Sequence, residues 1–227
     1  MRVLVTGGAG YIGSHTVLAL LEQGHTPVVI DNLSNSSFES LSRVSQLTSK
    51  EIEFHEFDLC DEDRLGSFLA AESFEAILHF AGFKAVGEST EKPLKYYSNN
   101  VGSTVSLLKA IQATSNPTPP KFIFSSSATV YGSSTELPLT ESSKIGEGIT
   151  NPYGFTKYVC EQILKDVALA NPAFQAIALR YFNPIGSHKS GLIGEDPKDI
   201  PNNLAPYITQ VASGKLSKLS VFGDDYD

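Results

Sequence analysis

The sequence lacks several features that would place it in other classes of protein. It has no tryptophan, two cysteines and one methionine. No apolar run reaches the length of about 18 residues that a membrane span requires. Cys60 and Cys160 lie far apart, which gives neither a disulfide framework nor a metal-binding pair. Lysine and arginine total 17 against 25 aspartates and glutamates, a net charge of −8. We therefore expect no membrane, no nucleic acid and no metal as partners.

The residues that are present indicate a folded protein of a reducing compartment. Hydrophobic residues make up 41% of the 227 positions, too many for a disordered chain. The chain enters a glycine turn at Gly7, which leaves no room for a signal peptide. Together with the few cysteines, this favours a cytoplasmic location. The length suits one large domain, or one domain and part of another.

Short apolar runs alternate with longer segments of helical period. They predict strands and helices at the spacing of repeated βαβ units, with nearly continuous apolar strands that are typical of a parallel sheet. One strand alternates apolar with polar residues, so we expect it near an edge of the sheet. The predicted strands are Val3–Thr6, Pro27–Ile30, Glu53–Phe57 (the expected edge strand), Ala76–Phe80, Phe122–Ser125 and Ala176–Arg180. The predicted helices are Tyr11–Gln23, Phe38–Thr48, Asp61–Ala71, Pro93–Ala113 and Pro152–Ala170.

After Arg180 the sequence changes character. A polar stretch with glycine and proline runs to Pro201, followed by a predicted helix, Asn202–Ser213, and a short predicted strand, Leu219–Phe222. The expected fold class is therefore α/β: a Rossmann-type doubly wound parallel sheet with the start of a smaller C-terminal lobe.

The first predicted strand leads into a glycine-rich turn that opens the first helix. Gly7, Gly10 and Gly13 would let backbone N–H groups approach a pyrophosphate, which the positive end of the helix also favours. Asp31 ends the second strand 18 positions after Gly13, where its carboxylate would accept hydrogen bonds from an adenosine ribose. That charge would repel a 2′-phosphate, so NAD is favoured over NADP. An ordinary turn residue is the alternative interpretation of Asp31.

Further residues follow the third and fourth strands at the same edge of the sheet. Asp58 and Leu59 would flank the adenine, Phe80 to Gly82 would lie beside the pyrophosphate, and Lys84 would meet its charge. Each position alone is an ordinary loop residue. Their joint placement at successive strand ends supports a dinucleotide site.

A tyrosine and a lysine stand four positions apart at the start of a predicted helix. Tyr153 and Lys157 therefore share one helix face, where the ammonium and a positive nicotinamide would lower the tyrosine pKa from about 10. The fifth strand ends at Ser127, whose hydroxyl would bridge a substrate oxygen and the tyrosine. The three side chains predict an acid–base centre. A core-facing tyrosine with a solvated lysine is the alternative.

With these residues in view, the sequence resembles the extended short-chain dehydrogenase/reductase superfamily, and within it the UDP-glucose 4-epimerase family. The glycine turn and the Ser/Tyr/Lys set indicate only the superfamily, whereas Lys84 to Ser89 and Ile200 to Leu204 are more particular. The resemblance covers essentially the whole chain. It also rests on Asp31 to Leu33, His79 to Gly82, Tyr96-Tyr97, Asn99-Asn100, Phe124 to Gly132, Asn151 to Gly154, Arg180 to Pro184 and Gly194 to Pro197.

The resemblance implies an NAD-dependent inversion at C4 of a UDP-hexose, which interconverts UDP-galactose and UDP-glucose through a 4-keto-hexose. Tyr153, held by Lys157 and paired through Ser127, would take the proton of the 4′-hydroxyl, and the protein would be a homodimer. The implied NAD contacts are Tyr11, Ile12, Asp31, Asn32, Leu33, Ser34, Asn35, Ser36, Asp58, Leu59, Phe80, Ala81, Gly82, Phe83, Lys84, Asn99, Tyr153, Lys157 and Phe182. The implied substrate contacts are Ser127, Tyr153, Asn183, Asn203, Leu204, Ser220, Val221 and Phe222.

Two other functions stay as alternatives. A nucleotide-sugar 4,6-dehydratase needs a further acid–base pair to remove water, yet Ser127 is followed by Ala128-Thr129-Val130 without a carboxylate. An NAD-binding sensor or inactive subunit would keep the glycine turn and lose the chemistry. The intact set of Ser127, Tyr153 and Lys157 argues against that loss.

The end of the chain adds a last expectation. Residues 1–180 are predicted to form the NAD-binding domain with its catalytic side chains, and 181–227 to form part of a UDP-sugar lobe. Asn203, in the first turn of a predicted helix, suits a diphosphate, with plain helix capping as the alternative. Members of the family continue further, so the resemblance implies a C-terminally truncated chain with a complete NAD site and an incomplete substrate site.

Overall fold

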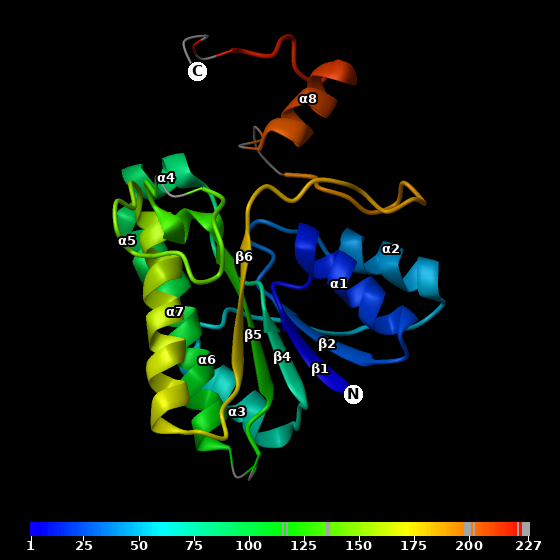
Figure 1. Ribbon diagram of the computed structural model, residues 1–227. Coiled ribbons are helices and arrows are strands. Elements are labelled where there is room, and N and C mark those ends of the chain that lie inside the picture. Colours follow the sequence, from blue (N-terminus) through cyan, green and yellow to red (C-terminus); the bar gives the residue numbers. More distant parts are fainter. Residues whose placement is uncertain are drawn as a thin grey trace.

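One parallel sheet organises the protein. The computed structural model describes residues 1–223 apart from 115, 117, 135, 136, 198–200, 202 and 222. Six strands lie in the order β3-β2-β1-β4-β5-β6 (Figure 1), which is the doubly wound Rossmann order. The strands are β1 Arg2–Thr6, β2 Thr26–Asp31, β3 Glu53–Glu56, β4 Ala76–His79, β5 Lys121–Ser127 and β6 Ala176–Tyr181. The predicted fold class and the positions of these six strands are confirmed, and β3 is an edge strand as expected.

Helices cover the sheet in two layers because alternate strand residues point to opposite faces. On one face, Val5 of β1 packs with Leu18 of α1 (Tyr11–Glu22) in a core that also includes α2 (Glu39–Thr48). On the other face, Leu4 and Phe124 join a core with Leu107 and Leu164. That second core is formed by α3 (Glu62–Ala71), α6 (Gly102–Ala113) and α7 (Pro152–Ala170) (Figure 1). Burial of each such side chain contributes about 1.5–3 kcal/mol.

The predicted helix Pro93–Ala113 is divided into three elements. α5 (Pro93–Tyr96) continues into a π-helical turn, η1 (Tyr97–Val101), and then into α6. Asparagine is a poor helix former, and the buried Asn100 side chain hydrogen-bonds the loop after β4 instead of following regular helical packing. A short helix that the pattern did not predict, α4 (Val86–Glu91), precedes α5. Its six residues are too few for a helical period.

The chain leaves the sheet after β6. α8 (Leu204–Ala212) forms within the predicted helix of this region. The predicted strand Leu219–Phe222 was wrong over its described residues, 219–221, because none of the described strands pairs with them and they are exposed. Phe222 lies outside the described residues. Within the described part of the chain, none of the helices has the length and apolar composition needed to cross a bilayer.

Candidate nucleotide site and acid–base centre

A cavity of about 520 Å³ opens where the carboxyl ends of the strands meet. β1 and β4 are neighbours in the sheet, and the connections that follow them run to opposite sides. Open α/β sheets bind ligands at the point where the strand order reverses in this way. Among the residues predicted to contact NAD, all but Leu33 line this cavity. The partly buried Leu33 side chain packs against the core beneath α1.

The residues predicted to contact substrate divide into two groups. Ser127, Tyr153, Asn183 and Asn203 line the cavity, so the structure brings them together with the nucleotide residues. Leu204, Ser220 and Val221 are not among the residues that line it, and Phe222 lies outside the described residues. Residues 219–221 do not add to the described sheet, so strand pairing does not direct their side chains toward the cavity.

The glycine turn is tightly packed against the rest of the cavity wall. Gly7 has a φ of +69°, and a Cβ there would lie 2.5 Å from the Ala81 backbone nitrogen. A Cβ on Gly13 would lie 2.2 Å from the Gly7 carbonyl oxygen. α1 then begins at Tyr11, with no side-chain hydrogen bond at its N-cap. The first N–H groups of a helix have no acceptor within it, which favours an anion at this end.

The Asp31 carboxylate is nearly buried at the end of β2 and is held in one orientation. Oδ2 accepts a hydrogen bond from Ala9 N at 3.0 Å. Oδ1 accepts from Leu33 N at 2.9 Å and from Ser36 Oγ at 2.8 Å. Because a carboxylate has about four acceptor positions, this carboxylate retains capacity for a ligand hydroxyl.

The tyrosine and lysine lie on the first turns of α7, which begins where Asn151 Oδ1 accepts a hydrogen bond from Gly154 N at 2.8 Å. Lys157 Nζ donates to Ser125 O at 2.7 Å and lies 5.9 Å from the centre of the Tyr153 ring. Ser127 Oγ accepts from Thr129 N and Thr129 Oγ1 at 3.2 and 2.9 Å. Two elements, α7 and the end of β5, thus bring the three predicted acid–base residues together.

Burial governs the proton affinities of these groups. It raises the pKa of Tyr153, and the hydrogen bond with Ser127 lowers it in part. Burial also lowers the pKa of Lys157 to about 8. The expectation that Lys157 depresses the tyrosine pKa is therefore not met by the protein groups alone, because loss of solvation outweighs the lowering by the Ser127 hydrogen bond.

Comparison with known proteins shows the family to which the chain belongs. A family model described as GDP-mannose 4,6 dehydratase matches residues 4–227. The chain belongs to this family. Among similar curated proteins, the UDP-glucose 4-epimerase of Erwinia amylovora is 58% identical over 226 residues, covering 100% of this chain and 66% of the relative. The UDP-glucose 4-epimerase of Caenorhabditis elegans is 54% identical over 235 residues, with the same two shares of 100% and 66%. The resemblance to UDP-glucose 4-epimerases is confirmed, and the chain spans 66% of the length of these two relatives.

Solved structures agree with this placement. A UDP-glucose 4-epimerase from Bifidobacterium longum, in complex with NAD+ and UDP, matches with a TM-score of 0.95 at 50% identity. The match covers 100% of this chain and 67% of that one. A UDP-glucose 4-epimerase from Stenotrophomonas maltophila, with bound NAD and formylated UDP-arabinopyranose, has a TM-score of 0.92 at 44% identity, covering 100% and 66%.

Two contacts of this family member at the cavity were not predicted from the sequence. Asn100 Oδ1 accepts from Phe83 N at 2.8 Å, and its Nδ2 donates to Phe83 O at 3.0 Å and to Thr156 Oγ1 at 3.2 Å. The asparagine thereby ties the loop after β4 to α7. The Glu195 carboxylate lines the cavity and accepts from Lys84 Nζ at 2.8 Å and Asn203 Nδ2 at 2.9 Å. Neither contact has a sequence spacing that could have revealed it.

Proposed function

We propose that the protein binds NAD and interconverts UDP-galactose and UDP-glucose by inverting C4 of the sugar through a 4-keto-hexose. The observation that carries the proposal is the convergence of Ser127, Tyr153 and Lys157 on the cavity that the glycine turn lines. The solved relative from Bifidobacterium longum contains NAD+ and UDP, and the curated relatives are named for this reaction.

The residues of the cavity fit NAD. A Cβ on Gly7 or Gly13 would collide with the backbone of Ala81 or of Gly7, so glycine is required for the tight turn that presents backbone N–H groups to a pyrophosphate. Asp31 is oriented for a ribose hydroxyl and disfavours a 2′-phosphate. NAD supplies a hydride acceptor for C4 and then the donor that returns the hydride. The residues proposed to hold it are Gly7, Gly10, Tyr11, Ile12, Gly13, Asp31, Asn32, Ser34, Asn35, Ser36, Asp58, Leu59, Phe80, Ala81, Gly82, Phe83, Lys84, Asn99, Lys157 and Phe182.

The chain's own residues supply the proton chemistry. Tyr153 accepts the proton of the 4′-hydroxyl as the alcohol is oxidised, and returns it when the ketone is reduced on its other face. The Ser127 hydroxyl bridges the sugar oxygen and the phenol and favours the phenolate, in keeping with its lowering effect on the tyrosine pKa. Lys157, anchored on Ser125 O, provides the positive charge that the phenolate requires.

Two asparagines are proposed as the substrate contacts that the cavity offers outside the acid–base centre. Asn183 follows β6, and Asn203 is the N-cap of α8, whose first N–H groups suit a diphosphate. We accordingly propose that residues 1–180 hold the cofactor and the acid–base centre, and that 181–227 contribute to the sugar-nucleotide side.

Conversion of UDP-galactose to UDP-glucose by the purified protein tests the proposal. We expect turnover that depends on Tyr153 and is abolished by Tyr153→Phe, which removes the base without changing the ring. If the wild-type protein binds NAD and its turnover does not exceed that of Tyr153→Phe, the enzymatic proposal is wrong and a sensor or inactive subunit takes its place.

A dehydratase is a second candidate because the matching family model is described as one. Removal of water would need a carboxylate close to Ser127, and the residue that hydrogen-bonds Ser127 is Thr129. We therefore expect no loss of water from GDP-mannose or UDP-glucose. Formation of a 4-keto-6-deoxy sugar, detected by mass spectrometry, would favour the dehydratase instead.

We also propose a homodimer in the cytoplasm. Leu94, Tyr97 and Phe155 are exposed apolar residues on α5, η1 and α7, and the Tyr97 and Phe155 rings lie 6.5 Å apart. A second copy would bury them. Cys60 and Cys160 are free thiols, which suits a reducing compartment. Light scattering of wild type and Phe155→Ser tests the dimer, which the substitution is expected to weaken.

A further inference from the structure

The helix that carries the acid–base residues has a third polar side chain on the same face. Tyr153, Lys157 and Glu161 follow one another at intervals of four along α7, so all three face the end of β5. Lys157 Nζ holds the Ser125 carbonyl at 2.7 Å, and the Ser126 hydroxyl donates to Glu161 Oε1. α7 thus contacts each of the two residues immediately before Ser127.

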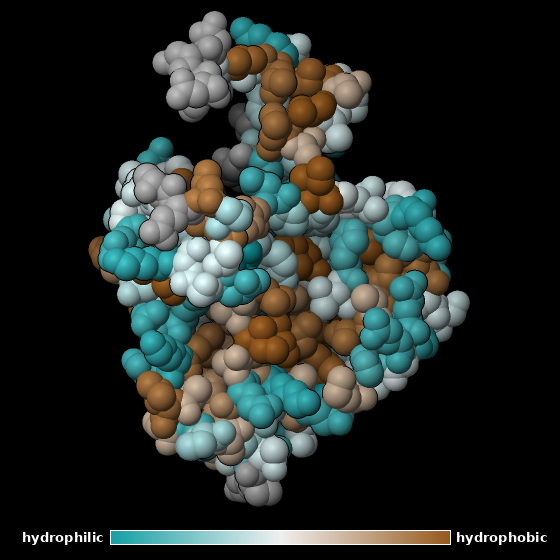
Figure 2. Space-filling view, in the orientation of Figure 1, coloured by the Kyte–Doolittle hydropathy of each residue, from teal (hydrophilic) through white to brown (hydrophobic). Residues whose placement is uncertain are grey.

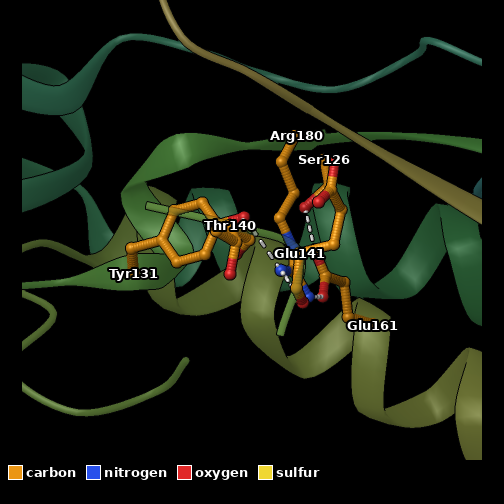
Figure 3. A network of polar contacts seen from close by, with 6 residues as sticks. All are labelled: Ser126, Tyr131, Thr140, Glu141, Glu161 and Arg180. Carbon is orange, nitrogen blue, oxygen red and sulfur yellow. Dashed lines mark hydrogen bonds and ion pairs between the residues drawn. The ribbon is translucent and has the colours of Figure 1, made fainter. Parts of the chain in front are cut away.

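Arg180 of β6 completes the contact with Glu161. Its Nη2 lies 2.8 Å from Glu161 Oε2 and its Nε 3.1 Å from Glu161 Oε1, a two-point pairing of guanidinium and carboxylate (Figure 3). The two side chains are 18% and 7% exposed. Hydrogen bonding to Glu161 raises the Arg180 pKa, so the guanidinium stays charged at neutral pH. Arg180 is also the register partner of Ser126 in the β5–β6 ladder.

The same guanidinium reaches the chain on the other side of Ser127. η2 (Ala128–Tyr131) follows β5 directly, and Arg180 Nη1 donates to the Tyr131 hydroxyl at 3.1 Å. The guanidinium carbon lies 5.0 Å from the Tyr131 ring centre, and Tyr131 OH donates to Thr140 O at 3.1 Å (Figure 3). The Tyr131 ring in turn stacks on Phe182 with ring centres 6.3 Å apart. Ser127 is therefore bracketed by residues that this one ion pair holds.

A buried ion pair is a weak contributor to stability, because the cost of removing both charges from water offsets most of their attraction. Its strength lies in fixed geometry, since a guanidinium and a carboxylate meet in one plane with two directed bonds. Proton transfer between Ser127, Tyr153 and a sugar oxygen depends on such geometry, and misplacement by about 1 Å can cost on the order of 100-fold in rate.

We infer that Glu161 and Arg180 are positioning residues that set the place of the Ser127 hydroxyl relative to Tyr153, acting through Ser126 on one side and Tyr131 on the other. This role rests on the proposed function for its effect on turnover. The placement of the Ser127 hydroxyl relative to Tyr153 does not depend on that function and can be measured without turnover.

Two substitutions that leave the net charge unchanged test the role. Arg180→Lys keeps the charge and removes the two-point pairing, and Ser126→Ala removes the hydroxyl that Glu161 holds. We expect each to lower kcat for UDP-galactose about tenfold or more while KM and the Kd for NAD stay within about threefold. When either substitution is combined with Glu161→Gln, kcat is expected to fall little below that of the more impaired single variant. All three substitutions disrupt the same hydrogen-bonded network, so their effects do not add.

Arg2→Lys serves as the matched control. Arg2 lies on β1 with its Nη2 2.7 Å from Glu72 and 3.1 Å from Glu53, an arginine–glutamate cluster that does not line the cavity. It is expected to lower the midpoint of urea unfolding and leave kcat unchanged. If kcat per folded molecule is unaffected in Arg180→Lys and Ser126→Ala, or falls equally in Arg2→Lys, the positioning role is overturned.

Titration of Tyr153 separates this inference from the proposed reaction. The hydrogen bond with Ser127 lowers the Tyr153 pKa, so a displaced Ser127 lets that pKa rise. The phenolate absorbance of each protein is measured against the same protein carrying Tyr153→Phe, and Arg180→Lys and Ser126→Ala are expected to titrate at higher pH than wild type. A shifted titration with no turnover in wild type would refute the reaction and retain the positioning role. An unshifted titration in an active enzyme would refute the positioning role alone.

Discussion

The Lys84 ammonium lies 2.8 Å from the Glu195 carboxylate, an ion pair that joins the loop after β4 to the segment that follows β6. The Glu195 side chain is 10% exposed, and the same Oε1 also accepts a hydrogen bond from Asn203. A carboxylate therefore neutralises a lysine that lines the cavity proposed for a dianionic pyrophosphate.

We predict that Glu195→Gln tightens NAD binding. The substitution removes a negative charge beside an anionic ligand and frees Lys84, while the amide oxygen can still accept from Asn203. A charge at about 4 Å is worth about 1 kcal/mol in water, which corresponds to roughly a fivefold lower Kd. Isothermal titration calorimetry measures it, with Glu62→Gln as control, since Glu62 pairs with Lys109 away from the cavity. A Kd that rises in Glu195→Gln would show that the glutamate organises the site rather than opposing the ligand.

The glycine turn offers a paired test of packing. Gly13 and Gly66 are both helical, in α1 and α3, but a Cβ at Gly13 would lie 2.2 Å from Gly7 O, whereas one at Gly66 meets nothing within 4 Å. We predict that Gly13→Ala lowers the free energy of unfolding by about 1–3 kcal/mol and abolishes measurable NAD binding. Gly66→Ala should raise the free energy of unfolding by about 1 kcal/mol, because alanine has a higher helix propensity than glycine. Urea unfolding and NAD titration of the two variants check both values, and equal NAD affinity in the two would contradict the close fit.

The buried Lys157 gives stability a dependence on pH. Its pKa falls from 10.5 to about 8 in the folded protein, so between these values the unfolded chain binds more protons than the folded one. The contribution of Lys157 to the free energy of unfolding therefore increases as the pH rises from about 8 to 10.5. The same contribution is lost as the pH falls back to about 8. Relative to Lys157→Met, wild type is expected to gain on the order of 3 kcal/mol between pH 7.5 and 10.5. Unfolding titrations of both proteins at the two pH values measure it, and parallel stability curves would contradict burial of this ammonium.

Local patterns revealed the sheet and most of the cavity wall. The apolar runs of β1, β2 and β5 are buried in the sheet, and the glycines, Asp31 and the strand-end loops meet at one edge because parallel strands end together. Tyr153 and Lys157 were found because four residues span one helical turn. These features depend on chain neighbours, and sequence reasoning is suited to them.

Contacts across the fold required the structure. Glu195 meets Lys84 from 111 positions away, and Arg180 meets Glu161 across the boundary between a strand and a helix. No periodicity links such residues, since their meeting is decided by packing. The predicted strand at Leu219 was wrong because a run of residues with high β-propensity also needs a partner strand. The pattern within the run gives no information about such a partner.

Apolar side chains on one face of the last strand are exposed, and we expect this surface to limit solubility. Ile177 and Leu179 of β6 are 60% and 36% exposed, and apolar side chains gather in the middle of the molecule in this view (Figure 2). We predict that Ile177→Thr with Leu179→Thr lowers the fluorescence of a bound hydrophobic dye and raises solubility. The free energy of unfolding should change by about 1 kcal/mol, because threonine suits a strand and both side chains are already partly exposed.

Ile77→Thr provides the buried counterpart in β4, where the side chain is 0% exposed. There the same change should cost about 2 kcal/mol or more, because a hydroxyl replaces packed methylene groups in the core. Chemical unfolding and dye binding of the two variants give the comparison. Equal destabilisation by both would mean that the β6 face is covered in solution, and unchanged dye binding in the double variant would place the apolar surface elsewhere.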